Sequence, residues 1–148
     1  MSGQEELVFD SFTVGQELPA FTRTVSVADI DEFCKTWGED NPIYLNDEAA
    51  KKVGFEGRVA PPMMVRNYAH LQNVLAGLNR VVPAHSIHIE GKYIFVNPVR
   101  PGDTITTTGK VISKYTKKGR KYISFEFISI NQKGEPVVVN EHTSIWPR

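Results

Sequence analysis

The first half of the chain carries apolar residues at helical spacing. After Ser26, apolar side chains recur at positions i, i+3, i+4 and i+7, at Ile30, Phe33, Cys34 and Trp37. This spacing places the four side chains on one face of an amphipathic helix, which we expect over residues 27–37. Ser26 and Asp29 have the spacing of a capping box at its start, and Gly38 marks its end.

Two further helices are expected before residue 80. Residues 39–42 read as a polar turn, and Asn46 is a suitable N-cap for a short helix over residues 47–53. Pro61 and Pro62 then open a third helix, because proline is tolerated in a first helical turn. Residues 63–78 contain no interior proline and are mostly apolar. They predict one long, largely buried helix.

The second half of the chain has the composition and alternation of strands. It is rich in Thr, Ile, Val and aromatic residues, and polar turns separate the runs. We expect a short early strand at 20–26, an aromatic and β-branched run around 93–99, and three strands at 104–115, 121–130 and 137–146. Helices followed by an antiparallel meander indicate an α+β fold.

Length and composition favour one domain over residues 1–148, since 148 residues are a common domain size and 41% of them are hydrophobic. The single cysteine, Cys34, excludes an internal disulfide and fits a reducing compartment. The first ten residues lack a signal-peptide pattern. No run approaches the roughly 18 apolar residues of a membrane span. A cytoplasmic protein that does not bind membranes is expected.

The charge is balanced overall but not along the chain. Residues 1–60 carry 12 acidic and 5 basic side chains, and residues 61–148 carry 5 acidic and 12 basic ones. Four bases gather at Lys117, Lys118, Arg120 and Lys121. This cluster reads either as a solvated hairpin tip or as a site for an anion such as the phosphates of coenzyme A. A neutral chain without a nucleic-acid motif does not predict a nucleic-acid partner.

Three segments, in this order, resemble the MaoC-like hot-dog family of hydratases and dehydratases. They are FCKTWGEDNPIYLNDEAAKKVGF at 33–55, GRVAPPMMV at 57–65 and HIEGKYIFVNPVRPGDTI at 88–105. The resemblance implies a hot-dog fold, in which an antiparallel sheet wraps a long central helix, here residues 62–78. It also implies side-by-side dimers that bind an acyl thioester of coenzyme A or acyl carrier protein.

The family's reaction is reversible addition of water across the 2,3 double bond of an enoyl thioester. A carboxylate and a histidine, five positions apart on one loop, hold and activate the water, since this chemistry needs a placed acid and base. A backbone N–H near the start of the central helix stabilises the thioester oxygen. No cofactor is implied.

The chain departs from the family's motifs at three positions. Glu39 stands at the aspartate position and Tyr44 at the histidine position. Tyrosine has a reference pKa of about 10 and is a poor base near pH 7. Pro62 stands at the glycine whose N–H binds the oxyanion, and proline has no N–H; the N–H of Met63 is the substitute. These changes resemble the family's N-terminal dehydratase-like subgroup, whose domains often accompany a second, catalytic hot-dog domain or subunit.

The candidate site residues each keep a plainer interpretation beside the functional one. As catalytic candidates we take Glu39, Tyr44 and His88, although Tyr44 also suits a packed aromatic and His88 a structural hydrogen bond. His88 and Glu90 lie two apart on an expected strand, and so share a face.

The expected substrate-binding residues are Asn41, Pro62, Met63, Glu90 and Arg66. Asn41 also fits a turn, and Arg66 an interface residue. The four histidines lack the spacing of a zinc site, and no Gly-x-Ser-x-Gly or P-loop pattern occurs. No metal is expected.

The sequence therefore predicts an acyl-thioester hydratase or dehydratase with a divergent site, as a homodimer or one half of a heterodimer with another hot-dog subunit. The alternative is a non-catalytic subunit that binds the acyl thioester and supports a catalytic partner. A hot-dog thioesterase ranks third.

Overall fold

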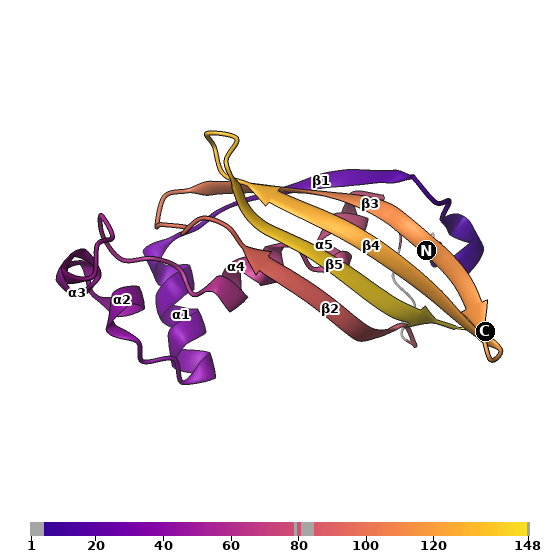
Figure 1. Ribbon diagram of the computed structural model, residues 1–148, viewed down its shortest axis with the longest axis horizontal. Helices are drawn as coiled ribbons and strands as arrows, with labels where there is room; N and C mark the ends of the chain where they lie inside the picture. The colour runs from indigo at the N-terminus through magenta and orange to yellow at the C-terminus, as the bar shows by residue number, and fades with distance from the viewer. Residues whose placement is uncertain (1–4, 79, 81–84, 148) are drawn as a thin grey trace.

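The computed structural model of the chain describes residues 5–78, 80 and 85–147. Five antiparallel strands form one sheet in the order β1-β3-β4-β5-β2, and helices lie at one end of the sheet and against one of its faces (Figure 1). The strand bounds are β1 Glu17–Thr24, β2 Ile87–Phe95, β3 Thr104–Lys117, β4 Arg120–Ile130 and β5 Pro136–Trp146.

The strands β3, β4 and β5 form the predicted meander. Lys118 and Gly119 both adopt positive φ, 49° and 74°, at the turn between β3 and β4, as a tight two-residue hairpin requires. The first strand begins three residues before the predicted start and ends at Thr24, because Ser26 is committed to capping the helix that follows. A short 3₁₀ helix, Phe9–Ser11, precedes it.

Helix α1, Val27–Trp37, is confirmed with the predicted caps. The Ser26 side chain accepts a hydrogen bond from the Asp29 N–H, Asp29 accepts one from the Ser26 N–H, and Gly38 ends the helix at φ 65°. Helix α3, Asp47–Lys52, is capped by Asn46 as expected. The stretch read as a turn contains one more helix, α2, Pro42–Leu45. Asn41 caps it and Pro42 occupies its first position.

The prediction of one continuous helix over 63–78 is wrong. The segment forms α4, Pro62–Tyr68, α5, Leu71–Leu75, and a 3₁₀ turn, Ala76–Leu78. The Asn67 carbonyl accepts the His70 N–H at 3.1 Å and the Asn73 side-chain amide at 3.0 Å. Side-chain amides compete in this way with the helical bonding pattern, so the helix breaks between Tyr68 and Leu71.

Both pieces of this helix are largely buried, as predicted. The α5 residues Leu71, Val74 and Leu75 pack with Phe125 and Phe127 of β4. The α4 residues Met64, Val65 and Tyr68 pack with Ile30 and Cys34 of α1 and with Val137 and Val138 of β5. Two apolar clusters therefore join the helices to the inner face of the sheet. Within the described residues, no helix is long and apolar enough to cross a membrane.

Candidate functional site

Two of the predicted catalytic residues follow α1, Glu39 in the loop and Tyr44 in the short helix α2. The Glu39 N–H donates to the Cys34 carbonyl, and the half-buried Glu39 carboxylate accepts the Asn41 N–H at 3.4 Å. Tyr44, also half-buried, packs against the apolar cluster between α1 and α4. We call Glu39 and Tyr44 together the loop site.

Charge and burial set the protonation of the loop site. Burial, and then the nearby charge of Glu39, raise the pKa of the Tyr44 hydroxyl above its ordinary value of 10. The phenol is therefore protonated near pH 7, where it donates a hydrogen bond and does not act as a base. Burial also raises the pKa of the Cys34 thiol, which agrees with the expected inert cysteine.

Arg58 holds the loop site in place. Its Nε donates to the Tyr44 carbonyl at 2.9 Å, and its guanidinium bonds the Asp31 carboxylate at 2.5 Å. The Arg58 N–H donates to Asp47 at 2.8 Å. The Arg58 side chain is only 13% exposed. Its guanidinium therefore links α1 and α2 through a partly buried cation, and its backbone N–H joins the same residue to α3.

Glu39 borders an open depression of about 410 Å³ that it shares with Gly38, Asp40 and Leu45. Water therefore reaches the Glu39 side of the loop. Asn41 caps α2 by accepting the Ile43 N–H at 3.2 Å, so its side-chain oxygen already has a structural partner.

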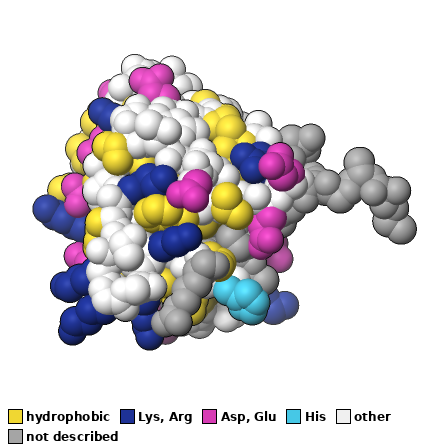
Figure 2. Space-filling view, turned by 90° about the vertical axis from the view of Figure 1, so that its right-hand side faces the viewer, with side chains coloured by type: hydrophobic (Ala, Val, Ile, Leu, Met, Phe, Trp, Pro, Cys, Tyr) yellow, Lys and Arg dark blue, Asp and Glu magenta, His cyan; other side chains and the backbone are white. Residues whose placement is uncertain are grey.

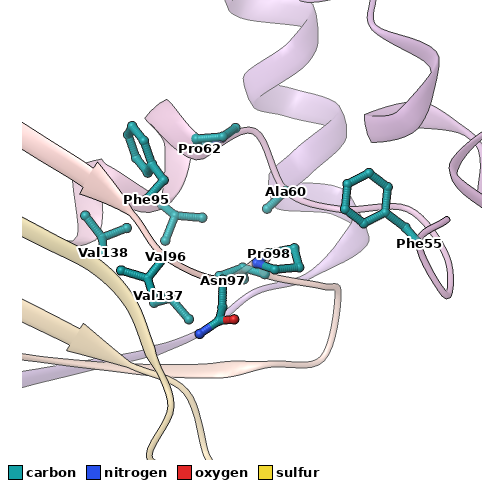
Figure 3. A pocket seen from close by; sticks show the side chains of 11 residues that line it. Phe55, Ala60, Pro62, Phe95, Val96, Asn97, Pro98, Val137 and Val138 are labelled. Carbon is teal, nitrogen blue, oxygen red and sulfur yellow. The ribbon is translucent and has the colours of Figure 1, made fainter. Parts of the chain in front are cut away.

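A second, apolar pocket of about 260 Å³ lies between α4 and the end of β2. Figure 3 shows Pro62, Phe95 and Val138 on one side of it. Pro62 occupies the first position of α4, and the N–H of the next residue, Met63, donates to no backbone oxygen among the described residues. The substitute donor predicted from the sequence is therefore available.

A polar group lies next to this pocket, between α4 and β2. Arg66 donates to the Tyr93 hydroxyl at 2.6 Å, and its guanidinium lies 4.7 Å from the Tyr93 ring centroid. A second Arg66 nitrogen bonds the Asn67 side chain at 3.2 Å. No carboxylate among the described residues lies within ion-pair distance of Arg66.

Three histidines extend this polar group. The His88 and His142 rings stack with centroids 3.9 Å apart, and His142 Nε2 lies 2.6 Å from the Ser144 hydroxyl. Burial lowers the pKa of His142 to about 3, with smaller effects from His88, His70 and Arg66. Burial likewise lowers the pKa of His70 and His88, and the Arg66 charge adds to both shifts.

His88 and Glu90 do not follow simple strand alternation. The β2–β5 register shifts between them, so that His88 pairs with Ser144 and Glu90 with Thr143. This bulge removes the basis for the expectation that the two side chains share a face. His88 instead contacts His142 and bonds the Glu90 carbonyl at 2.8 Å. Among the described residues no hydrogen bond or ion pair joins His88 to the loop site.

The sequence analysis missed Tyr93, Asn140 and His142. In the β2–β5 register Tyr93 lies opposite Asn140, and Gly91 opposite His142. Asn140, His142 and Ser144 are all buried, between the apolar residues Val138 and Trp146. Three polar residues at period two within one buried face of a strand were the available signal, because such positions are ordinarily apolar.

The basic cluster lies at the turn between β3 and β4. Lys117, Lys118 and Arg120 are exposed and Lys121 is half-buried. Figure 2 faces this end of the molecule and shows Lys and Arg side chains along one side of it. In Figure 1 this turn lies at the end of the sheet opposite α1, α2 and α3. It is therefore remote from the loop site within one chain.

Comparison with known proteins identifies the family. The model described as FAS1-like, dehydratase domain region, matches residues 12–140. The chain belongs to this FAS1-like dehydratase family. The UPF0336 protein of Streptomyces avermitilis is 30% identical over 115 residues, covering 74% of this chain and 75% of the relative. The (R)-specific enoyl-CoA hydratase of Rhodospirillum rubrum is 27% identical over 139 residues, covering 94% and 91%.

Solved structures place this FAS1-like dehydratase chain in the hot-dog fold. The monoamine oxidase regulatory protein from Archaeoglobus superimposes with a TM-score of 0.85 at 25% identity, over 99% of this chain and 97% of that one. The MaoC-like dehydratase from Rhodospirillum rubrum superimposes with a TM-score of 0.79 at 23% identity, over 96% of this chain and 97% of that one. A chain of the HadBC complex of Mycobacterium tuberculosis, a (3R)-hydroxyacyl-ACP dehydratase, superimposes with a TM-score of 0.78 at 22% identity, over 89% of this chain and 96% of that one. The predicted α+β hot-dog fold and the MaoC-like resemblance are confirmed.

Proposed function

We propose that this protein is a hydratase or dehydratase of acyl thioesters with a divergent active site. The observation that carries the proposal is the loop site, where the carboxylate of Glu39 borders a solvent-filled depression beside a protonated phenol. A carboxylate that holds water and a nearby hydrogen-bond donor are the groups that addition of water to an enoyl thioester requires. Related proteins with hydratase and dehydratase names support the same class of reaction.

Each group of the loop site has a distinct role in this proposal. Glu39 binds the water and takes its proton as the oxygen adds to carbon 3. The thioester oxygen passes through an enolate-like state, and the protonated Glu39 then gives the water's proton to carbon 2, which restores its carboxylate. The Tyr44 hydroxyl and the Met63 N–H are the donors for that oxygen, in place of the N–H that Pro62 lacks.

The second candidate is a non-catalytic subunit that binds the acyl thioester beside a catalytic hot-dog partner. Two observations favour it. The raised pKa of Tyr44 denies the loop a base at the histidine position, and Pro62 removes the usual oxyanion donor. Loss of one general base typically lowers a rate by about 10²–10⁴, so an isolated chain of this kind turns over slowly.

A hot-dog partner, either a second copy or a different subunit, is proposed to pair along β2. This strand is at the edge of the sheet, and Ile87, Ile89, Ile94 and Phe95 are exposed on it. Apolar edge strands are ordinarily covered. Sedimentation of the Ile94→Lys variant should show loss of the dimer, whereas Val53→Lys, also at an exposed apolar residue, should retain it. An unchanged mass for both variants contradicts pairing at β2.

An absorbance assay for hydration of crotonyl-CoA by the purified chain tests the function. Turnover on the usual enzymatic scale of roughly 1–10³ s⁻¹, lost in Glu39→Gln and kept in Asp40→Asn, makes the protein a hydratase. Absence of turnover, together with a rise in melting temperature on adding the thioester, makes it the binding subunit. Absence of both turnover and binding contradicts both candidates.

A further inference from the structure

The apolar pocket between α4 and β2 borders a polar stretch of the same two elements. Pro62 and Phe95 line the apolar pocket. Arg66 lies one helical turn after Pro62, and Tyr93 lies two strand residues before Phe95, where the β2–β5 register is regular. Positions i and i+4 of a helix share a face, as do positions i and i+2 of a strand. Arg66 and Tyr93 therefore continue the two walls of the pocket.

Asn140 completes this part of the groove from β5. It pairs with Tyr93 across the β2–β5 ladder, two pairs along from Phe95 and Val138 in the direction of His142. Asn140 is only 3% exposed, and its side chain makes no hydrogen bond among the described residues. Its Nδ2 is the atom that can donate to a carboxylate, because Oδ1 only accepts hydrogen bonds. An unbonded buried amide typically costs about 1–3 kcal/mol. We call Arg66, Tyr93 and Asn140 the arginine groove.

The arginine groove has a positive charge that makes no ion pair with any described carboxylate. Glu90 lies on the same strand as Tyr93, but its carboxylate makes no ion pair within the described part of the chain. Burial and, to a smaller extent, the charge of Arg66 lower the pKa of His70, His88 and His142. A guanidinium has five N–H donors, and within the described residues that of Arg66 makes two hydrogen bonds. Donors therefore remain for one anion.

We infer that the arginine groove binds a carboxylate at the far end of the acyl group, so that the preferred substrates are short thioesters of dicarboxylic acids. The inference rests on the proposed function. Guanidinium and side-chain amide groups together suit the planar, singly charged carboxylate. A pocket of about 260 Å³ lies below the roughly 300–1,000 Å³ of ordinary ligand sites, which fits a short acyl group and not the nucleotide part of coenzyme A.

Gly91 supports a specific role for Tyr93. A Cβ at position 91 would lie 2.3 Å from the Tyr93 hydroxyl, because the Tyr93 side chain folds back across its neighbour toward Arg66. A glycine is therefore required where the ring crosses the strand. The bond from Arg66 to Tyr93 orients the guanidinium along the groove.

The test compares two thioesters of equal chain length by isothermal titration calorimetry. Glutaryl-CoA ends in a carboxylate, and its monomethyl ester is the neutral counterpart. The wild-type chain should bind glutaryl-CoA about tenfold to hundredfold more tightly than the ester, as expected for a charge-assisted hydrogen bond. Arg66→Gln should make the two affinities equal. Arg23→Gln, which removes another arginine lying over a tyrosine ring, should keep the preference.

A second variant separates binding from folding. Asn140→Leu removes the unbonded buried amide at similar volume, so the melting temperature should stay the same or rise, while the preference for glutaryl-CoA falls severalfold. A wild-type chain that binds the ester as tightly as glutaryl-CoA overturns the inference and leaves the proposed function standing. A chain that binds neither thioester overturns both.

Discussion

The loop site and the arginine groove lie on either side of α4 and differ in charge, solvent access and origin. The loop site has a carboxylate, an open depression and a protonated phenol, and its positions match a family motif. The arginine groove has a cation and a buried, unbonded amide, and its three residues come from three separate parts of the chain. The first has the groups for chemistry on water, and the second has the groups for recognising an anion. Reaction type and substrate choice therefore depend on different parts of the chain.

The largest expected effect comes from restoring a base to the loop site. Tyr44→His should raise the rate of crotonyl-CoA hydration by about 10²–10⁴, because a neutral imidazole accepts a proton near pH 7 and a phenol does not. Steady-state kinetics measure the gain. The control is Tyr115→His, at an exposed tyrosine on β3. An unchanged rate in Tyr44→His would show that the loop site does not carry out the reaction.

The next largest effect is expected at Arg58, whose bonds hold the loop site in place. Arg58→Gln should lower the free energy of unfolding by about 1.5–3 kcal/mol, since it removes charge-assisted bonds from a side chain that is 13% exposed. Lys51→Gln, which breaks an exposed pair with Glu48, should cost less than about 1 kcal/mol. Urea denaturation measures both. An equal decrease in the free energy of unfolding in Arg58→Gln and Lys51→Gln would mean that Arg58 does not hold the loop site.

Acid should destabilise the protein through the histidines beside the arginine groove. The pKa of His142 is lowered from 6.5 to about 3 in the folded chain, chiefly by burial. Between these values the unfolded chain binds a proton that the folded chain does not. Stability is therefore lost as pH falls below 6.5, by up to about 1.4 kcal/mol per pH unit for this one group.

Urea denaturation between pH 6.5 and 5 measures this slope, to which His70 and His88 add because their pKa values are lowered too. The His142→Gln variant should show a shallower slope than the wild type. Identical slopes would mean that His142 is not buried as a neutral ring.

The smallest expected effect concerns the orientation of Arg66. Gly91→Ala should displace the Tyr93 ring and weaken binding of glutaryl-CoA by a few-fold, in line with about 0.5–1.5 kcal/mol for one hydrogen bond. In a Tyr93→Leu background the same change should have no further effect, because the ring that it displaces is absent. Isothermal titration calorimetry of Gly91→Ala in the wild-type chain and in the Tyr93→Leu variant decides whether Tyr93 positions the guanidinium of Arg66.

Sequence patterns predicted the loop site better than the arginine groove, for physical reasons. Glu39 and Tyr44 lie five positions apart, in the loop after α1 and in the short helix α2, and the caps of both helices can be read locally. Arg66, Tyr93 and Asn140 come together only through the β2–β5 register, which no local pattern gives. The same limit applies to the break in the central helix. The residues from 63 to 78 have helical spacing, but the helix breaks where the Asn67 carbonyl accepts the Asn73 side-chain amide and the His70 N–H.

Strand periodicity also failed where the sheet is irregular. The bulge between His88 and Glu90 breaks an alternation that the sequence alone presents as regular. The meander of β3, β4 and β5 was predicted closely because its turns carry glycine at positive φ, as at Gly119 and Gly134. Local turn chemistry is thus recoverable from the sequence, and long-range register is not.

A crystal structure with bound glutaryl-CoA tests the division between the two regions most directly. The account predicts that the terminal carboxylate lies about 2.7–2.9 Å from the Arg66 guanidinium, beside Asn140, with the acyl group along the pocket lined by Pro62 and Phe95. A carboxylate that points to solvent, or an acyl group bound away from α4, would contradict it.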